Sequence, residues 1–188
     1  LKSKVLLYEE KWSEAADYAL QTMNSGSFSI ADDYLGLFLP STQYGIPEII
    51  FSTQYLAPNY TTGSTEDLNV YLGNYGCIQP IQDLVDSYEC IDGKPIAESP
   101  LYDANDSTWV NRDPRLKLSM RNNKSEVWFT NNYLGQTGYV CRKYLDFSVF
   151  PWAYSQKNSD QDMVWLRYAE VLLIYAEAKN EASGPNES

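Results

Sequence analysis

Aromatic side chains set among amides and carboxylates are the residues of this sequence best suited to ligand chemistry. The chain has 16 Tyr, 5 Trp and 6 Phe, and many of them lie in its polar middle rather than in helical stripes. A sugar has an apolar C–H face and a rim of hydroxyls, so a flat ring suits the face and polar side chains suit the rim. The rings with Asn, Gln, Asp, Thr or Gly nearby are Tyr60, Tyr71, Tyr75, Trp109, Trp128, Tyr133, Trp152 and Tyr154.

These rings permit two interpretations. They could simply cover a core under long loops, or at least one of them could stack on a glycan. Loops of this length in a compact protein are usually functional. We expect Trp109, Trp128, Tyr133 and Trp152 to be the best candidates for stacking, with hydrogen bonds from neighbouring Asn, Asp, Gln and Arg side chains.

Histidine is absent from the chain. Its absence excludes, within this chain, a Ser-His-Asp or Cys-His nucleophile and a His-ligated catalytic zinc. General acid–base chemistry would fall to carboxylates, Tyr or Lys. A glycoside hydrolase needs two suitably spaced carboxylates. Nothing singles out such a pair among the 25 Asp and Glu residues, so hydrolysis stays an alternative.

The segment "DANDSTWVNRDP" at 103–114 invites comparison with a calcium-binding loop. Asp103, Asn105 and Ser107 would be its first three ligands. An EF-hand needs Gly at position six and Glu at position twelve, where this chain has Thr108 and Pro114. The sequence therefore predicts no EF-hand and no cofactor, and a looser calcium site stays an alternative.

Three cysteines, Cys77, Cys90 and Cys141, form no CxxC motif and no metal-binding spacing. One disulfide plus a free thiol is possible, and Cys77–Cys90 would close the shorter loop. Three buried free thiols fit the sequence equally well.

The segment "NRDPRL" carries Arg112, Asp113 and Arg115. The residue before a proline is held extended. We expect an Arg–Asp ion pair that fixes the loop rather than a ligand site.

The charge balance limits the classes of partner. Lys and Arg number 14 and Asp and Glu number 25, which gives a net charge of −11. An acidic surface disfavours nucleic acid and anionic membranes, because phosphate contacts need a basic face. No signal peptide or transmembrane run is present. The first residue, Leu1, already belongs to an amphipathic helix, so we interpret the chain as a piece of a longer protein.

Residues 1–26 predict two helices, the first over 1–10 and the second from an N-cap at Ser13 to Gly26. Trp12, Ala15, Ala19 and Met23 mark one packing face with small residues. Such a helix pair is typical of tetratricopeptide units.

The middle of the chain predicts short, irregular elements. A β-branched and aromatic run at 47–55 favours a strand, and proline begins a helix at 80–89. Short strands are expected at 126–132 and 137–146, and loops at 56–77, 103–116 and 150–162.

The segment "LRYAEVLLIYAEA" at 166–178 is nearly all apolar but carries three charges. A helix that is hydrophobic nearly all round is usually buried, and this one is too short and too charged to span a bilayer. Buried charges need partners. We therefore expect Arg167 to pair with Glu170, one turn along, and Glu177 to need a donor from another helix.

With 44% hydrophobic residues, the chain can form one sizeable core. We expect a single region, 1–188, that is mainly α-helical. Its parts are a helical segment 1–46, a loop-rich aromatic segment 47–162 and a buried helix 163–182.

The final helix, "LRYAEVLLIYAEAKNEA", strongly resembles the signature of the SusD/RagB family, the nutrient-binding outer-membrane lipoproteins of Bacteroidetes. Five further segments match the family in order. They are "KWSEAADYALQTMNSGSFSIADDYLGLF", "PEIIFSTQY", "PIQDLVDSYECIDGKPI", "NRDPRL" and "GYVCRKYLD".

The resemblance implies tetratricopeptide units packed against an irregular region, without enzymatic activity. It implies binding of oligosaccharides or other nutrients at the cell surface, and a partner transporter of the SusC type that depends on TonB. Family members are longer and are anchored in the outer membrane by a lipidated N-terminal cysteine, which this chain lacks. We therefore expect a fragment covering the middle and part of the C-terminal region of a glycan-binding protein.

Three alternatives remain at this point. One is the same fold binding a non-sugar nutrient such as a peptide. Another is a glycoside hydrolase that uses two carboxylates. The third is a tetratricopeptide-like scaffold that binds only its transporter.

Overall fold

The computed structural model describes residues 1–62, 68–74, 77–106, 108–122, 137–146 and 159–185. The helices are α1 (Lys2–Tyr8), α2 (Trp12–Asn24), α3 (Gln82–Asp86), α4 (Pro114–Ser119) and α5 (Tyr168–Ser183), with a 3₁₀ turn η1 (Gly36–Phe38) and a π-helical turn η2 (Asn69–Asn74). The strands are β1 (Ile49–Thr53), β2 (Met120–Asn122), β3 (Tyr139–Cys141) and β4 (Met163–Arg167). This mainly helical, loop-rich architecture with a few short strands confirms the predicted fold class.

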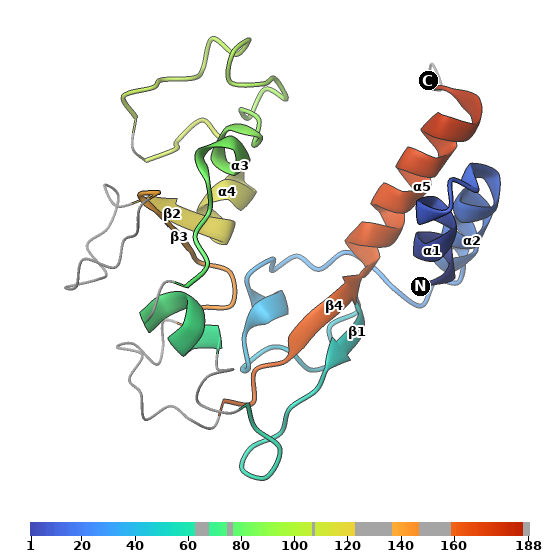
Figure 1. The fold of residues 1–188 in the computed structure, drawn as a ribbon, viewed down its shortest axis with the longest axis horizontal. Coiled ribbons are helices and arrows are strands. Elements are labelled where there is room, and N and C mark those ends of the chain that lie inside the picture. The colour runs from blue at the N-terminus through green and yellow to red at the C-terminus, as the bar shows by residue number, and fades with distance from the viewer. Residues whose placement is uncertain (63–67, 75–76, 107, 123–136, 147–158, 186–188) are drawn as a thin grey trace.

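Helices α1, α2 and α5 lie side by side at one end of the molecule (Figure 1). Small side chains allow this close packing, because Ala15 and Ala19 on α2 and Ala178 on α5 are completely buried. Ala19 packs against Val171 and Ile174 of α5. The predicted alanine face of the second helix is confirmed.

The ends of these helices differ slightly from the prediction. Helix α2 begins at Trp12 with Lys11 at its N-cap, so the predicted N-cap at Ser13 is wrong. Its end is as expected, because Gly26 directly follows the C-cap residue and has a φ of +66°. That left-handed conformation has no steric cost for glycine, which lets the chain turn away from the helix.

Helix α5 is buried on one face only. Val171, Ile174 and Ala178 are buried against α1 and α2, whereas Leu173 is 68% exposed. Within the described residues, the prediction of a helix buried nearly all round is therefore wrong. Glu177 is exposed, so water solvates its carboxylate and a donor from another helix is not required.

The predicted Arg167–Glu170 pair is not formed. Arg167 is the last residue of β4 and has extended dihedral angles, so it lacks the helical geometry that an i, i+3 contact needs. Its Nη1 donates instead to Oε1 of Glu48 at 2.6 Å. Glu170 pairs with Lys4 of α1, whose Nζ lies 2.6 Å from Oε1.

A two-stranded antiparallel ribbon of β1 and β4 lies between the two ends of the molecule (Figure 1). In its register Thr53 is opposite Met163 and Ile49 is opposite Arg167. Strand β1 confirms the strand predicted at 47–55. Strand β4 was not expected, because residues 163–182 read as one helix.

A buried glutamine ties the loop-rich part to the ribbon region. Gln161 donates from Nε2 to the carbonyls of Phe38 and Tyr144, each at 2.7 Å. Its own side chain is almost fully buried, so these bonds form away from water. Removal of the side-chain amide would leave buried carbonyls without this donor.

The other end of the molecule contains α3, α4 and a small antiparallel pair of β2 and β3 (Figure 1). Strand β3 confirms a strand within 137–146, whereas 126–132 lies outside the described residues. Helix α3 starts at Gln82, two residues after the proline predicted to begin it. Val85, Trp109, Leu116 and Met120 form the core of this end.

Within the described residues, no helix has both the length and the apolar composition that crossing a membrane would require.

Candidate functional site

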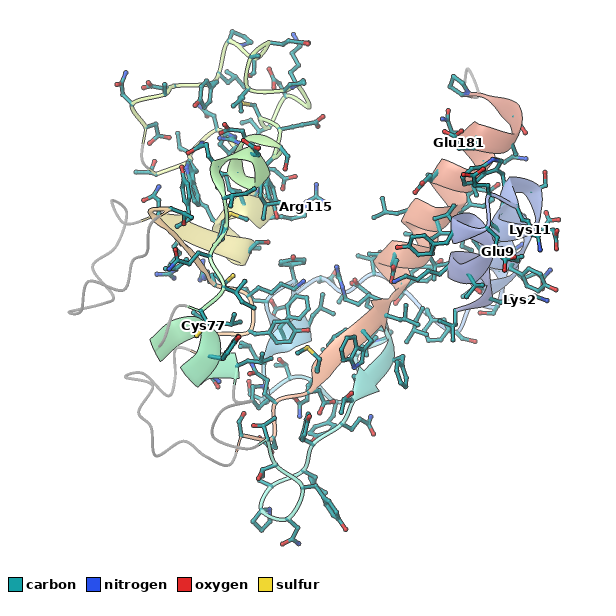
Figure 2. All side chains as sticks on the ribbon, in the orientation of Figure 1. Lys2, Glu9, Lys11, Cys77, Arg115 and Glu181 are labelled. Atoms are coloured by element: carbon teal, nitrogen blue, oxygen red, sulfur yellow. The ribbon has the colours of Figure 1, made fainter. Side chains whose placement is uncertain are left out.

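A cavity of about 370 Å³ lies between α3, the loop 101–112 and the start of β3, and we call it the α3–β3 pocket. Its walls carry three aromatic rings, several side-chain amides, three carboxylates and one guanidinium. In Figure 2 this region is the end of the molecule around α3 and α4, where Arg115 is labelled. The combination of rings and polar groups matches the general composition of small-molecule sites.

Trp109 and Tyr139 form the aromatic base of the pocket. Their rings stack with centroids 6.2 Å apart and planes 28° from parallel. Trp109 also packs into the core against Val85, Leu116 and Met120 and is only 9% exposed. Most of its surface therefore stabilises the fold, and the ring is not an open platform.

Tyr102 is the most accessible ring of the pocket, with 38% of its surface exposed. Its ring lies over the guanidinium of Arg112, whose Cζ is 5.6 Å from the ring centroid. This cation–π contact holds the ring in one orientation. Sequence reasoning missed Tyr102, although it precedes the same Asp- and Asn-rich segment that drew attention to Trp109.

Asx-type hydrogen bonds fix the conformation of the loop that forms one wall of the α3–β3 pocket. Asp103 Oδ1 accepts from the Asn105 amide at 2.8 Å. Asp106 accepts from the Thr108 hydroxyl at 2.6 Å and from the amides of Thr108 and Val110. These hydrogen bonds hold the pKa of Asp106 below its ordinary value, and the bond from the Thr108 hydroxyl has the largest effect.

Side-chain amides form the polar rim. Asn111 donates from Nδ2 to the Leu101 carbonyl at 3.0 Å, which closes the base of the loop. The Tyr139 hydroxyl donates to Gln82 Oε1 at 2.6 Å and links β3 to α3. Asn105 and Asn122 line the same cavity. Amides both donate and accept, so this rim suits a ligand with many hydroxyls.

Within the "NRDPRL" segment, Arg112, Asp113 and Arg115 hold the loop and the start of α4 in place. Arg112 is 5% exposed, and its Nη2 donates to the carbonyls of Val85 at 2.6 Å and Tyr88 at 2.7 Å. Asp113 caps α4 by accepting from the Arg115 amide at 2.8 Å. Asp113 also pairs with the Arg115 guanidinium, which lowers the pKa of the carboxyl. The predicted Arg–Asp bridge is confirmed.

Of the other predicted rings, the described residues include Tyr60 and Tyr71 alone. Trp128, Tyr133 and Trp152 lie outside the described residues, as do Tyr75 and Tyr154. Tyr60 and Tyr71 are exposed elsewhere on the surface. Of the four best candidates, the structure places Trp109 alone, and their role in stacking on a glycan stays a prediction.

In the described part of the segment 103–114, carboxylate oxygens accept hydrogen bonds from the loop itself. Asp103 and Asp106 direct oxygens at backbone amides of their own loop, and Ser107 lies outside the described residues. Across the described part of the chain, no group of three or more His, Cys, Asp or Glu side chains is arranged to hold a metal ion.

All three cysteines are free thiols. Cys90 is buried, Cys141 is partly buried, and Cys77 is exposed beside η2 (Figure 2). Of the two alternatives, the Cys77–Cys90 disulfide is not formed, and the free thiols are found, although only one of the three is fully buried.

A second, more open hollow of about 400 Å³ lies beside α3 and α4. Two arginines line it, and both already have acidic partners: Arg115 pairs with Asp113 and Arg167 pairs with Glu48. Because these cations are neutralised within the fold, the α3–β3 pocket is the stronger candidate.

Solved structures similar to this chain share one architecture. A SusD-like carbohydrate binding protein from Bacteroides fragilis is 28% identical, with a TM-score of 0.79 over 96% of this chain and 38% of that protein. A second SusD-like protein from the same organism is 22% identical, with a TM-score of 0.72 over 98% of this chain and 42% of the other. Surface glycan-binding protein A from Bacteroides fluxus is 20% identical, with a TM-score of 0.58 over 100% of this chain and 40% of that protein.

For the two proteins that are less than 25% identical to this chain, the likeness concerns the fold alone. The chain spans about two fifths of the length of these proteins.

A comparison with curated protein sequences finds no match. The family model of the SusD family matches residues 47–136 and 130–188, which is most of the chain. The chain therefore belongs to the SusD family, as the resemblance of its final helix and five other segments predicts.

Proposed function

We propose that this chain is part of a cell-surface protein that binds glycans without catalysing their cleavage, and that the α3–β3 pocket contributes to the binding site. Family membership and the 28% identical carbohydrate binding protein support the ligand class. Within the chain, residues 47–162 carry the ligand site, and residues 1–46 and 163–182 form the helical support.

The proposal rests on one observation: an accessible aromatic ring and several side-chain amides line the same cavity. Tyr102 offers a partly exposed aromatic face, oriented by Arg112. Asn105, Asn111 and Asn122 lie around the same space. A sugar ring stacked on Tyr102 would place its hydroxyls among these amides.

Asp106 fits a role in binding better than a role as the general acid of a hydrolase. A glycosidase needs a general acid whose pKa is raised, so that it holds a proton near neutral pH. The pKa of Asp106, which lies in the pocket, shifts in the opposite direction because its oxygens accept three hydrogen bonds. This carboxylate stays ionised and serves as an acceptor.

The full-length protein is proposed to sit on the outside of the outer membrane, held by a lipid on an N-terminal cysteine. There it would deliver the glycan to a TonB-dependent transporter of the SusC type. Co-purification of the full-length protein with such a transporter from outer-membrane extracts would support this, and recovery in the soluble fraction alone would contradict it.

Affinity electrophoresis of the full-length protein in gels containing different polysaccharides tests the ligand class. Retardation by at least one polysaccharide is expected, and Tyr102→Ala should weaken it about tenfold, equivalent to about 1.4 kcal/mol. Tyr8→Ala is the matched control, because Tyr8 is an exposed tyrosine on α1, outside the pocket. It should leave the retardation unchanged.

Further variants separate the alternatives. Trp128→Ala, Tyr133→Ala and Trp152→Ala test the remaining predicted rings by the same assay. Release of new reducing ends from a retained polysaccharide would favour a hydrolase over a binding protein. Retention of no polysaccharide, with binding of peptides instead, would favour the non-sugar alternative.

A further inference from the structure

The charge of the α3–β3 pocket suggests which glycans it accepts. Three carboxylates line the pocket, those of Asp86, Asp103 and Asp106. Among the described residues, their hydrogen-bond donors are uncharged: Asp86 Oδ1 accepts from Gln82 Nε2 at 2.7 Å, and the other two accept from backbone amides and the Thr108 hydroxyl. In the described part of the chain, none of the three takes part in an ion pair.

Arg112 is the one cationic side chain among the described residues that line the pocket. It is almost fully buried, and its Nη2 is occupied by the carbonyls of Val85 and Tyr88. The Tyr102 ring lies over the guanidinium. Its charge is therefore buried in the wall of the pocket. Among the described lining residues it is the one positive charge facing three carboxylates, and Lys117, outside the lining, acts on Asp106 from a distance.

From this arrangement we infer that the pocket selects glycans without acidic groups and rejects those that carry carboxylate or sulfate. This inference rests on the proposed function and names the ligand class for the same site. A carboxylate is a strong acceptor for a sugar hydroxyl. An anionic substituent offers no proton and brings a like charge close to these three carboxylates. Like-charge juxtaposition is an effective way to discriminate against a wrong ligand.

Titration calorimetry on the full-length protein tests this selectivity. The neutral probes are hexasaccharides of the cello, malto, xylo and manno series, and the acidic probes are a galacturonic acid hexamer and a heparin-derived hexasaccharide. At low salt, the best neutral probe should bind at least about tenfold more tightly than either acidic probe. The gap should narrow in high salt, because screening weakens the repulsion.

The double variant Asp86→Asn/Asp103→Asn keeps an acceptor oxygen at each position but removes two charges. The ratio of the acidic-probe Kd to the neutral-probe Kd should fall at least about fivefold. Asp17→Asn/Glu177→Gln, at exposed positions on α2 and α5, removes the same number of charges and is the matched control, which should leave the ratio unchanged.

The outcomes separate this inference from the proposed function. Tighter binding of an acidic probe than of every neutral probe would overturn the inference and leave glycan binding intact. The inference would also be overturned if Asp17→Asn/Glu177→Gln changed the Kd ratio as much as Asp86→Asn/Asp103→Asn does. Binding of neither class of glycan would overturn the proposed function together with the inference.

Discussion

Arg167 and Glu48 form a largely buried ion pair at one end of the β1–β4 ribbon, with Nη1 2.6 Å from Oε1 and the Glu48 side chain only 3% exposed. The second oxygen of Glu48 accepts from the Ala31 amide at 2.8 Å, and its backbone carbonyl accepts from the Tyr168 amide. Glu48 thus connects the segment before β1, the end of β4 and the first residue of α5.

Arg167→Met should destabilise the protein by about 3–5 kcal/mol, because it leaves the Glu48 carboxylate buried without its cation. The free energy of unfolding in urea, followed by circular dichroism, measures the loss. Lys4→Met is the control, since it breaks the Lys4–Glu170 pair, whose side chains are each about one third exposed. That variant should cost about 0–1 kcal/mol. Equal losses of unfolding free energy in the two variants would show that the burial of Glu48 does not determine how much its ion pair contributes to stability.

Lys143 should make stability depend on pH. Burial, with the nearby Arg167 adding to it, lowers the pKa of Lys143 to about 8, and its Nζ lies 4.2 Å from the Phe38 ring centroid. In the unfolded chain the pKa returns to its ordinary value of 10.5. Between these values the unfolded state binds more protons than the folded state, so stability rises as pH increases from about 8 to 10.5 and is lowest below that window.

Lys143→Met removes this titration. The variant should be more stable than the wild type at pH 7, and the difference should shrink as the pH approaches 10.5. Urea midpoints of the two proteins at pH 7, 9 and 10.5 measure this difference, and groups common to both proteins cancel in the comparison. A difference that does not change with pH would mean that Lys143 titrates normally in the folded state.

The three thiols should react with Ellman's reagent at different rates. Cys77 is exposed and should react first. Burial raises the pKa of the Cys141 thiol, which lowers its thiolate fraction and slows its reaction. Cys90 is buried and should react only when the protein unfolds. Cys77→Ser should remove the fast phase alone, and a fast phase that survives this substitution would contradict the assignment.

Ala19→Leu should destabilise the protein by about 1–3 kcal/mol through overpacking. Ala19 has no exposed surface and contacts Val171 and Ile174, so α2 and α5 would have to move apart. Gln21→Leu, at an exposed position on the same helix, should change stability by no more than about 0.5 kcal/mol. Thermal unfolding measures both, and a tolerated Ala19→Leu would mean that the interface can repack without cost.

The elements with strong local signals were predictable from the sequence. The alanine face of α2, the glycine after its end and the β-branched run of β1 depend on residues close together in the chain. Strand β4 was missed because its apolar run continues into α5, and periodicity alone does not divide such a run. The Arg167–Glu48 pair was missed because its members are 119 positions apart.

The candidate site was predictable in composition but not in its individual residues. Aromatic residues among Asn and Asp pointed to the loop that contains Trp109. Whether a ring is buried depends on distant contacts, and Leu116 and Met120 cover most of Trp109 while leaving Tyr102 accessible. The acidic character of the pocket depends on α3 bringing Asp86 beside the loop, which no local pattern specifies.

The loop-rich segment begins and ends at the same end of the β1–β4 ribbon. The chain leaves the ribbon after Thr53 and returns at Met163, its partner in the register. Insertions, deletions and substitutions within 54–162 can therefore accumulate without shifting α1, α2 or α5, which lie outside that excursion. A constant helical frame beside a segment free to diverge allows one architecture to evolve recognition of many different ligands.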